Sequence, residues 1–157
     1  MADELWPGRS ELQEVHPSLY LTNFFGSRNK KKLKAAGITH VLVCAQELPC
    51  VFEEDDAMDI TYLKLPLADN PGQVISSYFE PAFAMIDQAV ASGGKVLAHC
   101  AGGGSRSAAM CVGYVVSRAP AGTKVDDVIE RMQQVRPVVE PNWGFVEQLR
   151  TLEVSEK

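Results

Sequence analysis

The sequence lacks several features that would assign it to large classes of proteins. No apolar run approaches the ~20 residues that a membrane-spanning helix needs, so we expect no membrane insertion. The formal net charge is −5, and the absence of a dominant basic surface argues against a nucleic-acid binder. The first residues, Met-Ala-Asp-Glu-Leu-Trp-Pro-Gly, include acidic side chains and no apolar segment of the kind that a secretory signal contains.

The cysteines are too few and too scattered for a disulfide framework. There are four, Cys44, Cys50, Cys100 and Cys111, without Cys-x-x-Cys spacing. Together with the missing leader, this predicts a protein of a reducing compartment, cytoplasmic or also nuclear, in which Cys100 stays a thiol. We expect the other three to be core thiols, and a resolving role in reversible oxidation is the alternative.

The composition is that of one globular domain. The chain has 157 residues, of which 46% are hydrophobic, enough to bury a substantial core. No repeat and no second domain is visible, so we expect a single domain over 1–157. Residues 1–12 are polar and interrupted by Pro and Gly, which predicts a loosely ordered N-terminal arm.

Strands and helices are expected to alternate early in the chain, with helices gathered late. Strands are predicted over 16–21, after a turn at His16-Pro17, and over 38–45, 60–65 and 95–100; helices are predicted over 27–36, 76–92, 107–117, 124–135 and 142–152. The helix 107–117 is apolar on nearly all sides, which indicates a buried central helix. The pattern predicts an α/β fold with a central mixed β-sheet flanked by helices.

Two local signals within these helices allow sharper predictions. Ser77 and Glu80 have capping-box spacing, and Gly37 is a natural helix stop. The helix 27–36 also carries a run of lysines, at 30, 31, 32 and 34. We favour a solvated helix face for this run, and docking of an acidic partner is the alternative.

The segment from Lys95 to Met110 combines a short apolar strand, a glycine-rich turn and a helix of small residues. Such a turn gathers backbone N–H groups at a helix N-terminus, where they favour an anion. Cys100 and Arg106 stand at its two ends with five residues between them. A thiol in this place is an activated nucleophile, and a guanidinium there can grip a phosphate or sulfate with two parallel hydrogen bonds.

The string His99-Cys100-x-x-Gly103-x-x-Arg106-Ser107 gives each of its residues a task. Cys100 would attack phosphorus while Arg106 holds the phosphoryl oxygens. The Ser107 hydroxyl would donate to the thiolate, and His99 would buttress the turn. Glycines let the backbone curl closely around a ligand. The expected anion cradle consists of Ala101, Gly102, Gly103, Gly104, Ser105 and Arg106. A purely structural Cys100 is the alternative, but it leaves the glycines and the arginine without a purpose.

This string resembles the signature loop of the protein tyrosine phosphatase superfamily, and its form Gly103-x-Ser105-Arg106-Ser107 is most similar to the dual-specificity branch. Further segments resemble that branch in the same order: Leu19-Tyr20-Leu21, Gly37-Ile-Thr-His-Val-Leu42, Tyr78-Phe-Glu and Arg136-Pro-x-x-x-Pro-Asn-x-x-Phe145. The resemblance covers residues 13–152. It implies the protein tyrosine phosphatase-like fold of a small atypical dual-specificity phosphatase that consists of the catalytic domain only.

The resemblance also implies the reaction. The expected substrate is a phosphorylated protein, dephosphorylated at phosphotyrosine and at phosphoserine or phosphothreonine through a phosphocysteine intermediate, with no metal and no cofactor. In this family an aspartate upstream of the signature protonates the leaving oxygen, and Asp69 matches its position. The same carboxylate would then deprotonate the water that hydrolyses phospho-Cys100. Asn142 matches a family asparagine and is expected to form structural hydrogen bonds near the site.

Alternatives remain for the acid and for the substrate. Asp69 could be an ordinary turn residue beside Asn-Pro-Gly, and Asp87, inside a predicted helix, is a competing carboxylate. Gly102 and Gly104 stand where relatives often carry alanine and a larger apolar residue, which predicts a flexible loop and a lower pocket wall. The loop has no lysine, unlike many phosphoinositide-directed relatives. A phosphoinositide or an RNA 5′-phosphate remains an alternative substrate, and a phosphoprotein-binding pseudophosphatase is the alternative class.

Overall fold

A five-stranded mixed sheet forms the centre of the structure, a computed structural model that describes residues 8–155. Its strands are β1 (Gln13–His16), β2 (Leu19–Thr22), β3 (His40–Val43), β4 (Thr61–Lys64) and β5 (Val96–His99), in the order β1-β2-β5-β3-β4. β1 is antiparallel to β2, and all other pairs are parallel. All four residues of β5 are buried, as expected for the middle strand of a sheet that is covered on both faces.

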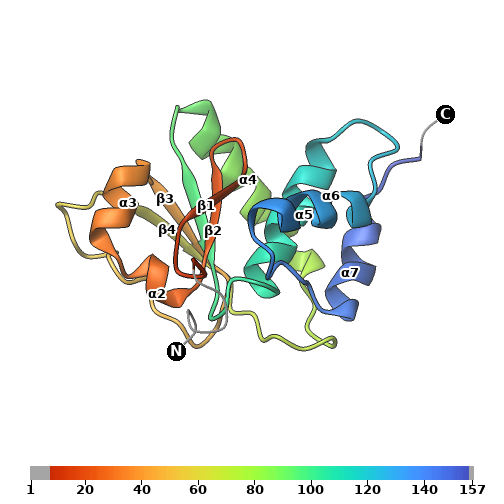
Figure 1. The fold of residues 1–157 in the computed structure, drawn as a ribbon, viewed down its shortest axis with the longest axis horizontal. Coiled ribbons are helices and arrows are strands. Elements are labelled where there is room, and N and C mark those ends of the chain that lie inside the picture. Colours follow the sequence, from red (N-terminus) through yellow and green to blue (C-terminus); the bar gives the residue numbers. More distant parts are fainter. Residues whose placement is uncertain (1–7, 156–157) are drawn as a thin grey trace.

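Helices cover both faces of this sheet (Figure 1). One face carries α2 (Phe24–Ser27) and α3 (Lys30–Ala36); the other carries α4 (Phe79–Ala91), α5 (Arg106–Arg118), α6 (Val125–Val135) and α7 (Trp143–Arg150). The predicted α/β fold with a central mixed sheet is therefore confirmed. Among residues 8–155, no helix is long and apolar enough to cross a membrane.

Helix α5 occupies the middle of the helical layer. It contacts β2 and β5 of the sheet and the three helices α4, α6 and α7. Its residues from Arg106 to Val116 are all buried, which confirms the predicted buried central helix. Cys111 on α5 and Cys44 after β3 are fully buried core thiols, whereas Cys50 is half-buried. Burial raises the pKa of each of these three thiols.

The predicted strand 16–21 is a hairpin in the structure. β1 ends at His16, Ser18 takes a left-handed φ of 66° in the turn, and β2 follows. Sequence analysis missed β1 because it is a short edge strand in which only Val15 is fully buried. Of the predicted arm, residues 1–7 lie outside the described residues. In the part from 8 to 12, the Ser10 carbonyl accepts a hydrogen bond from Thr22 Oγ1 at 3.3 Å.

The predicted helix 27–36 begins later than expected. Asn29 interrupts it, because its Oδ1 accepts the backbone N–H of Lys32 at 3.0 Å and so caps α3. The expected stop is confirmed, since Gly37 ends α3 with φ 74°. In the predicted basic face, Lys30 pairs with Asp55 at 2.9 Å, and Lys32 pairs with Glu11 at 2.8 Å.

The predicted capping box at Ser77 and Glu80 is wrong. Residues Ser76–Tyr78 form a 3-10 turn, and Tyr78, the residue before α4, makes no side-chain cap. A long-range partner replaces the local one, because Gln148 Oε1 on α7 accepts the N–H groups of Ile75 at 2.7 Å and Ser76 at 3.0 Å. The remaining predicted elements are present, with ends shifted by at most two residues.

Candidate active site

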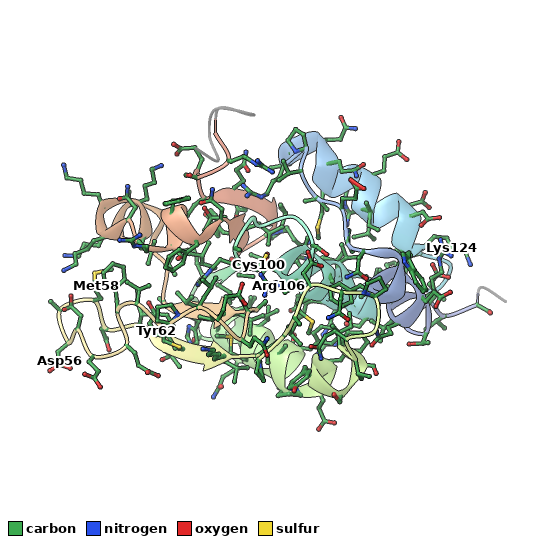
Figure 2. The ribbon with its side chains drawn as sticks, turned by 90° about the horizontal axis from the view of Figure 1, so that it is seen from below. Asp56, Met58, Tyr62, Cys100, Arg106 and Lys124 are labelled. Carbon is green, nitrogen blue, oxygen red and sulfur yellow. The ribbon has the colours of Figure 1, made fainter. Side chains whose placement is uncertain are left out.

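The turn between β5 and α5 carries Cys100 and Arg106 at its two ends. β5 ends at His99 and α5 begins at Arg106, so residues 100–105 form the turn. β5 lies between β2 and β3 in the parallel part of the sheet, and ligands of such sheets bind beyond the carboxyl ends of the strands. Figure 2 shows the two labelled side chains close together near the middle of the molecule.

The carbonyl groups of the turn point away from its centre. Four consecutive carbonyls accept hydrogen bonds from outside the turn: Ala101 from Phe24 N (3.1 Å), Gly102 and Gly103 from Arg136 Nη2 (3.2 Å) and Nε (2.9 Å), and Gly104 from Glu140 N (2.6 Å). A trans peptide bond directs its C=O and N–H groups oppositely, so the N–H groups of residues 102–105 face the inner side of the turn. N–H groups that point inward form a concavity that binds anions. The predicted cradle requires its N–H groups to point in this direction.

The Cys100 thiol lies at the base of this concavity. It is 3% exposed, its Sγ is 3.2 Å from Ser107 Oγ, and it accepts the N–H of Gly103 at 3.3 Å. The N-terminus of the 13-residue helix α5 begins six positions later. The Gly103 N–H donates to the sulfur, the Ser107 hydroxyl can do the same, and the helix N-terminus favours an anion at this place.

Of the three glycines in the turn, Gly103 has the left-handed backbone conformation. Its φ is +71°, and a Cβ placed there would collide with the Thr22 carbonyl oxygen and lie 2.5 Å from Arg136 Nη2. A Cβ at Gly104 would lie 2.5 Å from the carbonyl oxygen of Val138, so the larger apolar residue expected from relatives does not fit here. Gly102 has open space around it, so an alanine would fit at that position.

Arg106 is aimed by an acidic partner that sequence analysis missed. Its Nη1 donates to Glu47 Oε1 at 2.7 Å and to the Leu67 carbonyl at 3.0 Å, and its Nη2 donates to Glu47 Oε2 at 2.8 Å. A guanidinium has five N–H donors, so Nε–H and one Nη2–H remain on one edge. That edge can hold two oxygens of a phosphate in parallel hydrogen bonds.

The ion pair shifts the pKa of both side chains so that each favours its charged form. Hydrogen bonding to Glu47 raises the pKa of Arg106 although burial opposes this, and hydrogen bonding from Arg106 lowers the pKa of Glu47. No motif marks Glu47 in the sequence. The one indication of its role is that it follows β3. The carboxyl end of β3 lies at the same edge of the sheet as the carboxyl end of β5.

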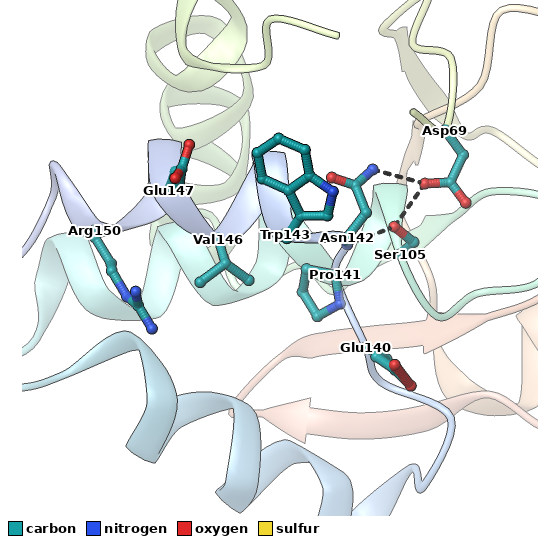
Figure 3. A pocket seen from close by; sticks show the side chains of 9 residues that line it. All are labelled: Asp69, Ser105, Glu140, Pro141, Asn142, Trp143, Val146, Glu147 and Arg150. Carbon is teal, nitrogen blue, oxygen red and sulfur yellow. Dashed lines mark hydrogen bonds between the residues drawn. The ribbon is translucent and has the colours of Figure 1, made fainter. Parts of the chain in front are cut away.

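Asp69 lies on the loop after β4 and reaches the turn. Its Oδ1 accepts hydrogen bonds from Ser105 Oγ at 2.7 Å and from Asn142 Nδ2 at 3.0 Å, and the N–H of Asn142 donates to Ser105 Oγ at 3.1 Å (Figure 3). Asn142 also caps α7 by accepting the N–H of Phe145 at 2.9 Å. These bonds hold the Asp69 loop, the turn and the start of α7 together, and both hydrogen bonds to Asp69 are accepted by its Oδ1.

Asp87, the competing carboxylate, is engaged elsewhere. It accepts a hydrogen bond from Tyr114 Oη at 2.7 Å and pairs with Arg118, both on α5. Hydrogen bonding to Arg118, and then to Tyr114, lowers the pKa of Asp87. The carboxylate therefore stabilises the contact between α4 and α5.

Two buried residues support the turn from behind. Arg136 is fully buried, bonds the carbonyls of Gly102 and Gly103 as described, and donates to Gln13 Oε1 at 2.7 Å. Its role was missed, although the Arg-Pro pair in the sequence marks it. His99 is also fully buried, with Nδ1 3.5 Å from the Cys100 carbonyl. Burial lowers the pKa of His99 to about 4, so its ring is neutral at pH 7.

One cavity, of about 290 Å³, unites the predicted groups. Cys100, Arg106 and Asp69 all line it, together with the predicted cradle residues Ala101, Gly102, Gly104 and Ser105. Ser107 and Asn142 lie behind the lining and contact it through Cys100 and Asp69. Arg9, which sequence analysis did not single out, contributes a second basic side chain to the wall.

The chain is similar to known proteins over most of its length. The chain is 36% identical to serine/threonine/tyrosine-interacting protein B of Xenopus laevis over 96% of this chain and 68% of the relative. It is 34% identical to human dual specificity protein phosphatase 18 over 91% of this chain and 73% of that one. Its fold matches the crystal structure of human tyrosine phosphatase-like serine/threonine/tyrosine-interacting protein with a TM-score of 0.81, at 34% identity, covering 91% of this chain and 95% of that one.

A family comparison covers nearly the whole described chain. Residues 19–155 match the family described as dual specificity phosphatase, catalytic domain. The match contains β2 to β5, the signature turn, the Asp69 loop and the helices that hold them. The chain belongs to the dual-specificity phosphatase family.

Proposed function

We propose that this chain is an active protein phosphatase that hydrolyses phosphotyrosine, and also phosphoserine and phosphothreonine, through a phosphocysteine intermediate. The observation that carries the proposal is the single cavity lined by the Cys100 thiol, the Arg106 guanidinium and the Asp69 carboxylate. A nucleophile, an anion clamp and a proton donor in one cavity are the groups that two-step phosphate ester hydrolysis needs. The reaction needs a free thiol, so we expect the enzyme to work in a reducing compartment such as the cytoplasm.

Substrate binding would use the inner surface of the turn. The non-bridging phosphate oxygens would accept the inward N–H groups of residues 102–105 and the free edge of Arg106. This would place phosphorus above Cys100 Sγ, with the ester oxygen directed toward Asp69. The fixed donors would stabilise the charge that spreads over the phosphoryl oxygens in the transition state.

In the first step, the Cys100 thiolate would attack phosphorus while the P–O ester bond breaks. Asp69 would give its proton to the departing oxygen, because a phenolate or alkoxide leaves poorly without one. Oδ1 of Asp69 already accepts two hydrogen bonds, so Oδ2 would carry the proton. In the second step, water would attack phosphorus, Asp69 would take its proton, and the S–P bond would break. The Ser107 hydroxyl, 3.2 Å from Sγ, would donate to the departing thiolate.

The second candidate is a phosphoprotein-binding protein without turnover. The relatives favour it in part, since they include proteins named as interacting proteins beside proteins named as phosphatases. The residues of this chain argue for turnover, because a binding module needs the cradle and Arg106 but neither a thiol nor an acid.

Hydrolysis of a generic aryl phosphate under reducing, metal-free conditions separates the two candidates. We expect turnover by the wild-type protein and its loss in Cys100→Ser, which changes one atom and keeps the cradle. Absence of turnover in the wild type, with phosphopeptide binding retained, would establish the binding protein instead. Rates on phosphotyrosine peptides, phosphothreonine peptides, phosphoinositides and RNA 5′-phosphates then test the substrate class. A lipid or RNA preferred over all the peptides would contradict the protein-directed proposal.

A further inference from the structure

A second and larger cavity opens beside the catalytic one. Its volume is about 690 Å³, and Figure 3 shows the side chains that line it, from the Asp69 loop, the turn, the segment before α7 and α7 itself. We call it the flanking groove. Asp69, Ser105 and Glu140 line both cavities, so the two adjoin each other. A peptide whose phosphorylated residue lies over Cys100 can therefore extend a neighbouring side chain into the flanking groove.

An exposed tryptophan forms part of the flanking groove. Trp143 is 67% exposed, the largest exposed fraction among the large apolar side chains of residues 8–155. It is the first residue of α7, and the Asn142 cap fixes the start of that helix. Pro141 and Val146 lie beside it in the lining. An exposed indole in the lining of a cavity offers a large apolar surface and a ring face to a ligand.

The charges of the flanking groove are mainly acidic. Glu140 and Glu147 are exposed and line it, whereas Arg150 is the only basic residue in the lining among residues 8–155. The Arg150 guanidinium is already paired with Asp126 on α6 at 3.2 Å. Acidic side chains beside an indole suit a cation, because the carboxylates attract it and the face of the ring binds it through its quadrupole. An acidic side chain would be repelled at the same place.

We propose that the flanking groove is a specificity subsite that binds an arginine or lysine side chain near the phosphorylated residue of a protein substrate. The inference rests on the proposed function. The basic side chain would lie against the Trp143 indole with its charge toward Glu147 or Glu140, while the phosphate lies in the cradle. The enzyme would thus read opposite charges at two adjoining cavities, phosphate at Arg106 and a cation at Trp143.

Binding measured without turnover tests this subsite directly. The probes are peptides with a non-hydrolysable difluorophosphonate in place of the phosphate of tyrosine, in an alanine background. Arginine, glutamate or leucine is placed in turn at each of the three positions on either side. Calorimetry with the wild-type protein should show one position at which arginine binds ~5-fold tighter than alanine, from one exposed cation–π contact and screened charges. Glutamate there should bind more weakly than alanine.

For each variant we compare the affinity for the arginine peptide with the affinity for the alanine peptide. Both peptides carry the same phosphate mimic, so a change in its binding to the cradle does not alter this ratio. Trp143→Ala should bring the ratio close to one, Trp143→Phe should keep part of it, and Glu147→Gln should reduce it. Glu130→Gln, on the exposed face of α6 outside the flanking groove, removes the same charge and should keep the full ratio. Thermal unfolding of each variant confirms that it is folded.

Several results would overturn the subsite. They are equal affinity for arginine, leucine and alanine at every position, a preference for glutamate, or a ratio that survives Trp143→Ala and Glu147→Gln. No binding of any peptide by a protein that hydrolyses the aryl phosphate would also overturn it. An arginine preference that depends on Trp143, in a protein without hydrolysis, would support the subsite and refute the phosphatase proposal.

Discussion

Replacing Glu47 by alanine tests whether this carboxylate aims Arg106 or competes with the phosphate. Glu47 binds the Nη1 and Nη2 ends of the guanidinium and leaves the Nε edge free. We infer that Glu47 positions the free edge over the turn. Its removal should therefore weaken catalysis, although it also removes a negative charge from the site.

The expected size follows from the geometry of the pair. Hydrogen bonds between charged groups contribute ~1.5–3 kcal/mol when buried. The Glu47 side chain is 49% exposed while Arg106 is 8% exposed, so solvent screens part of the interaction. The bond from Nη1 to the Leu67 carbonyl also remains in the variant. A net loss of ~1.4 kcal/mol in transition-state stabilisation corresponds to a ~10-fold lower kcat/KM.

Steady-state kinetics on an aryl phosphate, with inorganic phosphate as a competitive inhibitor, measures the effect. A misaimed Arg106 should raise KM and the inhibition constant of phosphate and lower kcat. Glu47→Gln should fall between the wild type and the alanine variant, since one amide oxygen can still accept. Asp55→Asn, which removes a carboxylate paired with Lys30 at 2.9 Å, controls for overall charge. An unchanged kcat/KM in Glu47→Ala would refute the positioning role, and tighter phosphate inhibition would indicate that Glu47 competes with phosphate.

Three further predictions concern stability and the acid. The pKa of His99 lies at about 4 in the fold, below its ordinary 6.5, so the unfolded chain binds more protons between these values. Stability should fall by ~2 kcal/mol from pH 7 to pH 5 in urea unfolding, and less in His99→Asn. Gly103→Ala should lower the melting temperature by several degrees because of its positive φ and the Thr22 carbonyl, whereas Gly102→Ala should change it little. Asp69→Ala should slow turnover of an ester with a poor leaving group ~100-fold and leave phosphate binding intact.

Each of these has a result that contradicts it. An equal pH dependence in His99→Asn would remove His99 as its source. Equal melting temperatures for the alanine variants at 102 and 103 would contradict the collision at Gly103. A rate unchanged by Asp69→Ala would move the acid to another group, and Glu140 on the same cavity would be tested next.

The sequence determined those parts of the site that lie within one short segment. The string from His99 to Ser107 predicted the turn, its glycines and the residues that meet around the thiol, because neighbours in the chain decide backbone conformation at this range. The same holds for α5, whose apolar residues on all sides indicate burial in any fold. Gly37 ended its helix where expected, since a left-handed residue there needs no tertiary partner.

Tertiary structure decided which side chains orient and support the residues of the turn. Glu47 lies 59 positions from Arg106, and Arg136 lies 33 from Gly103. Gln148 displaced the predicted capping box from 72 positions away. None of these bonds leaves a local pattern, because each joins residues that lie far apart in the sequence. Parallel pairing brings the loops after β3, β4 and β5 to one edge of the sheet, and α6 and α7 bring Arg136 and Asn142 to the same place. The thiol and its turn could be predicted because they lie within one short segment. The pocket around them could not, because it forms from segments that only the fold brings together.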